Sequence, residues 1–131
     1  MTTIREKFVT KIRDIELAIA NHAKWATHLS KAISDAQLEI PLATIGSDDV
    51  CEFGQWLYGA EVSEEDRASA DFQTVRDLHA EFHKVAREVA ELAASSNRFA
   101  AYTLLYGEYM AISGRLSIAM SAWKERLLHL P

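Results

Sequence analysis

Apolar side chains recur at steps of three and four residues from residue 4 to about residue 33. This spacing places them on one side of an α-helix and predicts a long amphipathic helix. The stripe consists of Ile4, Phe8, Ile12, Ile15, Ile19, His22, Ala26, Leu29 and Ile33. His22 stands where an aliphatic residue would be expected, so its side chain is predicted to point into the core.

A second stripe with the same spacing begins at residue 75 and also contains histidine. Its members are Val75, Leu78, His79, Phe82, His83, Ala86, Val89, Ala90 and Ala93. Ser63 and the acidic residues after it are typical of a helix start, because they cap the first turn and suit its dipole. The break at residues 95–97 predicts the N-cap of a last helix, which extends to about Leu127.

The region between the two stripes is less regular. A loop is predicted over residues 34–49 by four turn-forming residues, Pro41, Gly46, Ser47 and Asp48. The apolar segment at residues 50–58 predicts a short helix that Ser47 or Asp48 caps and that ends near Gly59.

These elements predict an all-α protein. Long helices joined by short connections pack antiparallel, so we expect an antiparallel four-helix bundle with a short inserted helix that carries Cys51. A chain of 131 residues fits one domain over residues 1–131. The last helix is apolar on more than one face, which predicts a homodimer contact or, alternatively, central burial. Its apolar residues include Leu104, Leu105, Tyr106, Tyr109, Met110 and Ile112.

Composition narrows the class of function. A net charge of −5 argues against a nucleic-acid partner, because there is no basic footprint for phosphates. No signal peptide and no apolar stretch of about 18 residues occurs, so we expect a cytoplasmic protein without a membrane partner. A single cysteine, Cys51, fits a reducing cytosol and leaves its thiol free for metal or redox chemistry.

Three histidines and the cysteine form a candidate metal site. His79 and His83 are four residues apart and share one helix face, and His22 also points inward. With Cys51, they could supply three imidazoles and one thiolate, a sufficient tetrahedral shell for Zn²⁺. The alternative is a metal-free dimerisation bundle, in which the histidines are packed and the cysteine behaves as a small apolar residue.

Other chemistry fits this pattern less well. A zincin helix needs glutamate directly after the first histidine, whereas Glu81 follows His79 by two residues and faces elsewhere. A hemerythrin-like iron or O₂-binding bundle would need about five histidines, which would force His28 and His129 inward from positions predicted to be solvated. The sequence shows no nucleophile and base pair and no phosphate-binding loop, so we expect no enzyme.

The order of these residues resembles a known family. His22, the run Cys51-Glu-Phe-Gly-Gln-Trp56-Leu-Tyr58 and His79-x-x-x-His83 are similar to the signature of the chemoreceptor zinc-binding (CZB) domain, a bacterial module. The resemblance spans nearly the whole chain, and the Cys-x-Phe-Gly-x-Trp element is specific. Trp25 follows His22 by three residues, as an aromatic residue often does in that family.

The resemblance implies a helical bundle that homodimerises and binds one Zn²⁺ per subunit through His22, Cys51, His79 and His83. It also implies a cytosolic location and attachment to chemotaxis receptors or to diguanylate cyclases, which make cyclic di-GMP. In that family zinc, or oxidation of the cysteine by hypochlorous acid, changes the output. This chain reaches Pro131 without an output domain, so we expect a stand-alone domain or a fragment of a larger signalling protein.

Cys51 is the redox-sensitive candidate, since a zinc-bound thiolate is nucleophilic and oxidation makes it a poorer ligand. Gly54 would permit a close approach or tight turn beside it, and Trp56 would anchor the short helix or simply pack. Three carboxylates lie near enough in sequence to orient an imidazole: Asp48, Asp49 and Asp77.

Overall fold

The computed structural model describes residues 4–60 and 62–129, with the side chains of residues 10–60 and 62–129. These residues form helices and loops without a β-strand, which confirms the all-α prediction. The helices are α1 (Ile4–Ala23), α2 (Trp25–Asp35), α3 (Leu42–Gly46), α4 (Glu52–Leu57), α5 (Glu64–Arg67), α6 (Ala70–Ala94), α7 (Arg98–Leu104), the π-helix η1 (Leu105–Tyr109) and α8 (Met110–Leu128).

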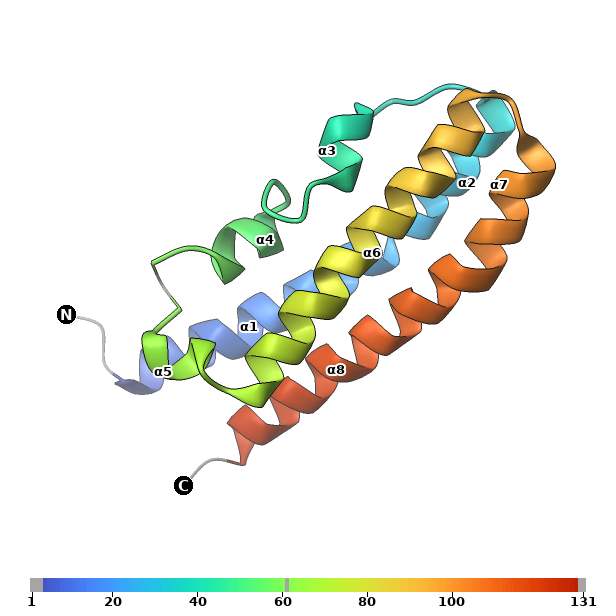
Figure 1. The fold of residues 1–131 in the computed structure, drawn as a ribbon. Coiled ribbons are helices and arrows are strands. Elements are labelled where there is room, and N and C mark those ends of the chain that lie inside the picture. Colours follow the sequence, from blue (N-terminus) through green and yellow to red (C-terminus); the bar gives the residue numbers. More distant parts are fainter. Residues whose placement is uncertain (1–3, 61, 130–131) are drawn as a thin grey trace.

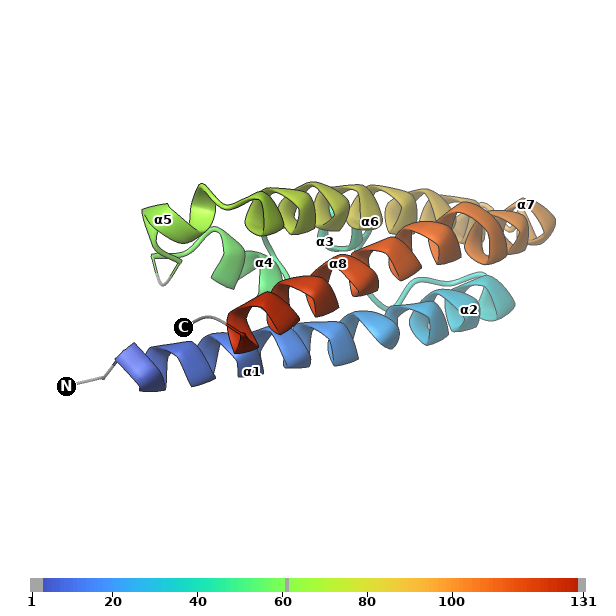
Figure 2. The same cartoon turned by 90° about the horizontal axis from the view of Figure 1, so that it is seen from below.

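The first predicted helix is divided into α1 and α2 directly after His22. The Lys24 N–H donates to the Asn21 carbonyl at 3.2 Å, three residues back, which tightens the turn and ends α1. The Lys24 backbone stays in the right-handed helical region (φ −77°, ψ −17°). The two helices therefore continue in nearly one direction as a single arm (Figure 2).

Three long arms build the molecule: α1 with α2, α6, and α7 with η1 and α8 (Figure 1). Lys11 pairs with Asp66 at 2.5 Å near the start of the first two arms, and Ser34 bonds Tyr102 at 3.1 Å at their far end. The first two arms therefore run parallel, and only α8 runs back. The expected antiparallel packing is wrong for this pair, because the long connection over residues 36–69 returns the chain to its starting end.

The short helices α3 and α4 lie beside α6 and the first arm, where a fourth long helix would lie in a bundle (Figures 1 and 2). The four-helix bundle is therefore not confirmed among the described residues. α4 does carry the cysteine at its start, as predicted. Its predicted cap is wrong, however, because the Cys51 thiol itself accepts the Gly54 N–H at 3.3 Å.

Two other predicted helix starts are confirmed. Ser63 accepts the Asp66 N–H at 3.1 Å, although α5 ends at Arg67 and a second serine cap, Ser69, begins α6. Asn97 accepts the Ala100 N–H at 3.4 Å and caps α7. Hydroxyl and amide side chains occupy these positions because they pair N–H groups that lack an intrahelical acceptor.

The predicted stripes meet in one core between the three arms. All members of the second stripe except the half-buried Leu78 are buried, including both histidines. In the last arm, Leu105, Tyr109 and Ile112 face this core, whereas Tyr106 and Met110 are exposed. Ile4 and Phe8 lie outside the described side chains.

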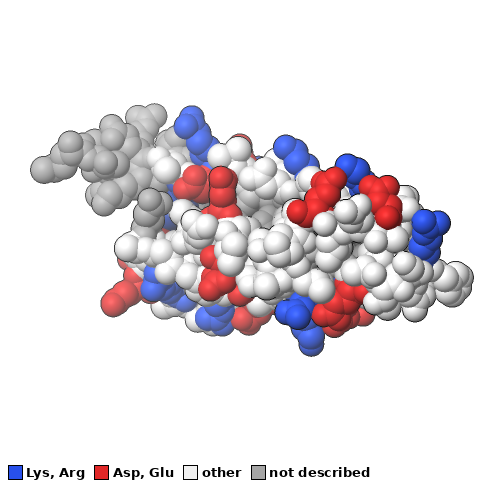
Figure 3. Space-filling model, turned by 90° about the horizontal axis from the view of Figure 1, so that it is seen from above, with Lys and Arg blue, Asp and Glu red and all other residues white. Residues whose placement is uncertain are grey.

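The remaining surface carries charges of both signs, which are spread along the face shown in Figure 3. Within the described ranges, no helix combines the length and the apolar character needed to span a bilayer.

Candidate metal centre

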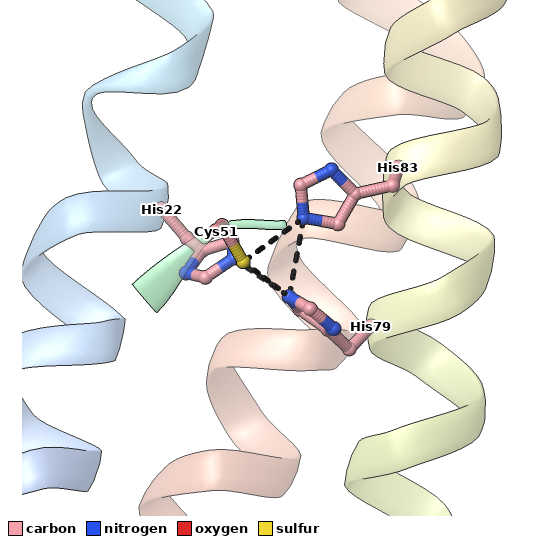
Figure 4. Close-up of side chains that lie close together, drawn as sticks. All are labelled: His22, Cys51, His79 and His83. Atoms are coloured by element: carbon pink, nitrogen blue, oxygen red, sulfur yellow. Dashed lines mark hydrogen bonds between the residues drawn. The ribbon is translucent and has the colours of Figure 1, made fainter. Parts of the chain in front are cut away.

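Four side chains from three separate segments converge in the core (Figure 4). His22 comes from the last turn of α1, Cys51 from the cap of α4, and His79 and His83 from successive turns of α6. Their nearest donor atoms all lie within 4.8 Å of one another. The structure thus brings together the four residues that the sequence singled out.

His79 lies at the centre of this group. Its Nε2 is 3.1 Å from His22 Nε2, 3.1 Å from His83 Nε2 and 3.3 Å from Cys51 Sγ. Cys51 Sγ is 3.6 Å from His83 Nε2. Tetrahedral zinc with its usual bond lengths requires donor separations of about 3.3 to 3.6 Å. The spacing therefore fits a shell of three nitrogens and one sulfur.

Backbone carbonyls fix the orientation of two imidazoles. His22 Nδ1 lies 2.8 Å from the Ala18 carbonyl, and His83 Nδ1 lies 2.8 Å from the Ile45 carbonyl. A carbonyl only accepts, so each Nδ1 must carry the hydrogen and each Nε2 must present a lone pair. Two bare nitrogens thus point at the same place, which a cation would satisfy and a hydrogen-bonded pair of imidazoles would not.

None of the three carboxylates suggested from the sequence makes a described hydrogen bond with an imidazole. Asp48 accepts from Tyr58 at 2.6 Å, Asp77 pairs with Arg76 at 3.0 Å and Asp49 is exposed. The Ala18 carbonyl lies one helical turn before His22 and could have been named from helix geometry. The Ile45 carbonyl could not, since its approach depends on how α3 packs on α6.

The third imidazole is held differently. His79 is fully buried, and its Nδ1 has no hydrogen-bond partner. Its other nitrogen faces only the two histidines and the cysteine. A buried polar group without a partner is costly, so this imidazole lacks compensation from the protein. Coordination through Nε2 would supply that compensation.

Burial keeps the three imidazoles neutral at pH 7. Loss of hydration lowers the pKa of His22 to about 4 and that of His79 to about 2, and it also lowers the pKa of His83. Neutral imidazole is the form that binds a metal. Burial raises the pKa of the Cys51 thiol, and the Gly54 N–H acts against that rise. A cation at the centre of the group would stabilise the thiolate.

The family model of the chemoreceptor zinc-binding domain (CZB) matches residues 22–90. The matched segment includes all four converging residues and covers more than half of the 131-residue chain. The chain belongs to the CZB family. No curated protein and no solved structure matches it. Zn²⁺ is the metal of this family, and the donor set described above fits it.

Aromatic rings enclose the centre of this CZB domain. Phe53 lies 5.3 Å from His79 and Phe82 lies 5.2 Å from His22, measured between ring centroids. Trp25 lies 6.0 Å from His83, so the tryptophan that follows His22 borders a ligand candidate on the neighbouring arm. These edge contacts exclude water and strengthen electrostatic interactions inside the site.

Gly54 makes the close approach that the sequence predicted. A Cβ atom at this position would lie 1.8 Å from the Asp48 carbonyl oxygen. The loop before Cys51 therefore crosses α4 where only glycine fits.

Trp56 bridges two elements of the CZB domain. Its ring stacks on Phe53 with centroids 5.6 Å apart and lies 5.8 Å from Trp123 of α8. It therefore links the cysteine helix to the last arm. Both roles suggested for this residue, anchoring and packing, describe these contacts.

The two remaining histidines lie away from the centre. His28 and His129 are exposed, as the helical pattern predicted. A hemerythrin-like site with five histidines is therefore not assembled by the described side chains.

Proposed function

We propose that this CZB domain is a zinc-dependent regulatory module in which His22, Cys51, His79 and His83 bind one Zn²⁺. One observation supports this most: three neutral imidazoles and the only thiol turn their donor atoms to one buried point. Zn²⁺ would supply a positive charge that pairs these donors and keeps the sulfur deprotonated.

The donor count favours regulation over catalysis. Four protein donors complete a tetrahedral shell, whereas catalytic zinc sites keep a position open for water or substrate. His22, His79 and His83 are buried and Cys51 is half-buried, so the cysteine is the donor that a reagent can reach. We propose that the metal state of this group modulates bacterial signalling, in chemotaxis or in cyclic di-GMP synthesis.

We propose in addition that Cys51 makes the site redox-sensitive. Its thiolate would attack the oxygen of hypochlorous acid, forming an S–O bond while chloride leaves, so that the sulfur is oxidised and the chlorine reduced. The resulting sulfenic acid is a weaker ligand than the thiolate.

The partners we propose are a second copy of the chain and an output domain in cis or in trans. Several large apolar side chains on the last arm are exposed, which suits a homodimer interface; they are Phe99, Tyr106, Met110 and Ile118. Light scattering of the purified protein should give twice the chain mass of 14.7 kDa. A monomeric mass at micromolar concentration would contradict the dimer.

Metal analysis tests the central proposal. Protein purified without chelator should contain about one zinc per chain, as four protein donors form one structural site. Treatment with a strong chelator should remove the metal and lower the melting temperature, since a ligand that binds only the folded state stabilises it. Folded protein without zinc, and with stability indifferent to added zinc or chelator, would instead support the metal-free dimerisation bundle.

The redox proposal predicts zinc release by oxidant. Hypochlorous acid should release zinc and produce sulfenic acid at Cys51, which a sulfenate-selective probe would detect. Cys51→Ala is the control, because its residual zinc should be indifferent to the same dose of oxidant. Retention of zinc in the oxidised wild-type chain would refute this part of the proposal.

A further inference from the structure

The loop before Cys51 is attached to the helix that follows it. Tyr58 Oη donates to the Asp48 carboxylate at 2.6 Å, and Gln55 Nε2 donates to the Val50 carbonyl at 2.8 Å. Gly54 lies directly against the Asp48 carbonyl. Three residues of α4 and its end thus hold residues 48–50, the three residues that precede the cysteine.

These attachments lie on one side of α4. Gly54, Gln55 and Tyr58 share a face at helical spacing. Phe53 and Leu57 lie on the opposite face and are buried in the core. The core contacts therefore fix α4 on one side, and the loop folds over the other side.

Cys51 stands where this folded-back loop joins the helix. Its carbonyl accepts the Gln55 N–H at 2.9 Å, and its Sγ lies 3.3 Å from His79 Nε2. A tetrahedral site tolerates misplacement of a donor by only a few tenths of an ångström. Whatever holds the loop on α4 therefore also sets the place of the sulfur.

We propose that Tyr58 is a positioning residue for the metal ligand Cys51, acting through its hydrogen bond to Asp48, with Gln55 as a second fastening of the same loop. This inference rests on the proposed zinc function and adds residues that make no contact with the metal donors. The Tyr58 hydroxyl remains protonated and able to donate, because burial and the neighbouring Asp48 raise its pKa to about 12.

Tyr58→Phe is the sharpest variant, since it removes only the hydroxyl and leaves the Asp48 carboxylate in place. Zinc affinity, measured by competition with a chromophoric chelator, should fall about fivefold, the effect of one hydrogen bond to a charged acceptor. In a Cys51→Ala background the same substitution should change affinity by less than about twofold, because Tyr58 acts through the sulfur. Tyr106→Phe, an exposed tyrosine on the last arm, is the matched control and should change neither value.

A second measurement does not depend on zinc. Cys51 is the chain's only cysteine, so iodoacetamide alkylation of the zinc-free protein reports on this thiol alone. Tyr58→Phe should raise the alkylation rate about fivefold by releasing the loop. Adding Gln55→Ala should raise it further, and circular dichroism would verify that each variant is folded.

Equal losses of affinity in both backgrounds, or no loss in either, would overturn the proposal. An unchanged alkylation rate in both the single and the double variant would also overturn it. A wild-type chain that binds no zinc would refute the proposed function instead, and the alkylation rates would then decide the positioning role alone.

Discussion

Replacing His79 with alanine should reduce zinc affinity by about a thousandfold or more, because a closed site would lose one of its four donors. His79 has the largest expected effect of the four, since its Nε2 lies within 3.3 Å of the other three donor atoms. Isothermal titration or chelator competition would measure the change.

A second variant separates metal binding from packing. His79 is fully buried, so alanine also leaves a cavity that costs about 2 to 4 kcal/mol of stability even without metal. His79→Gln keeps most of the volume and should lose zinc affinity with less loss of stability. His28→Ala, at an exposed histidine of α2, is the matched control and should bind zinc like the wild type. Nearly normal affinity in both His79 variants would exclude this residue as a ligand.

Gly54→Ala should displace the cysteine arm and lower zinc affinity by about a hundredfold, the upper range for residues that orient a ligand. The added Cβ would lie 1.8 Å from the Asp48 carbonyl oxygen, far inside contact distance, and both partners are backbone. Either α4 or the loop must therefore move, and Cys51 moves with them. Cobalt-substituted protein would show this as a loss of the sulfur-to-cobalt charge-transfer band.

Gly114→Ala provides the matched control. A Cβ at Gly114, in the exposed surface of α8, would meet no atom within 4 Å, so alanine should stabilise the helix by about 0.5 to 1 kcal/mol and leave zinc binding unchanged. Wild-type zinc affinity and an intact cobalt spectrum in Gly54→Ala would show that the loop adapts, contrary to the close contact described above.

Much of the metal centre could be predicted because helical periodicity carries directional information. The stripe that contains His22 and the pair at residues 79 and 83 indicated inward-facing imidazoles before any fold was known. The cysteine helix was also predictable, since an apolar segment lay between turn-forming residues. Its cap was not, because thiols are uncommon caps and Ser47 or Asp48 appeared better suited.

The remaining differences arise from tertiary packing. The expected antiparallel packing assumed short connections, whereas residues 36–69 fold into α3, α4 and α5 and return the chain so that α6 runs parallel to the first arm. The His83 hydrogen bond to the Ile45 carbonyl joins residues 38 positions apart, and no local pattern encodes it. The division at Lys24 likewise interrupts an unbroken stripe.

The contact between Trp56 and Trp123 makes motion of the cysteine helix observable in the unmodified protein. Two indoles 5.8 Å apart are close enough for their electronic transitions to couple, which gives a signed pair of bands in circular dichroism. One indole belongs to the cysteine helix and the other to the last arm. The amplitude of this couplet would therefore report, without any label, how far the arm that holds the sulfur has moved from α8.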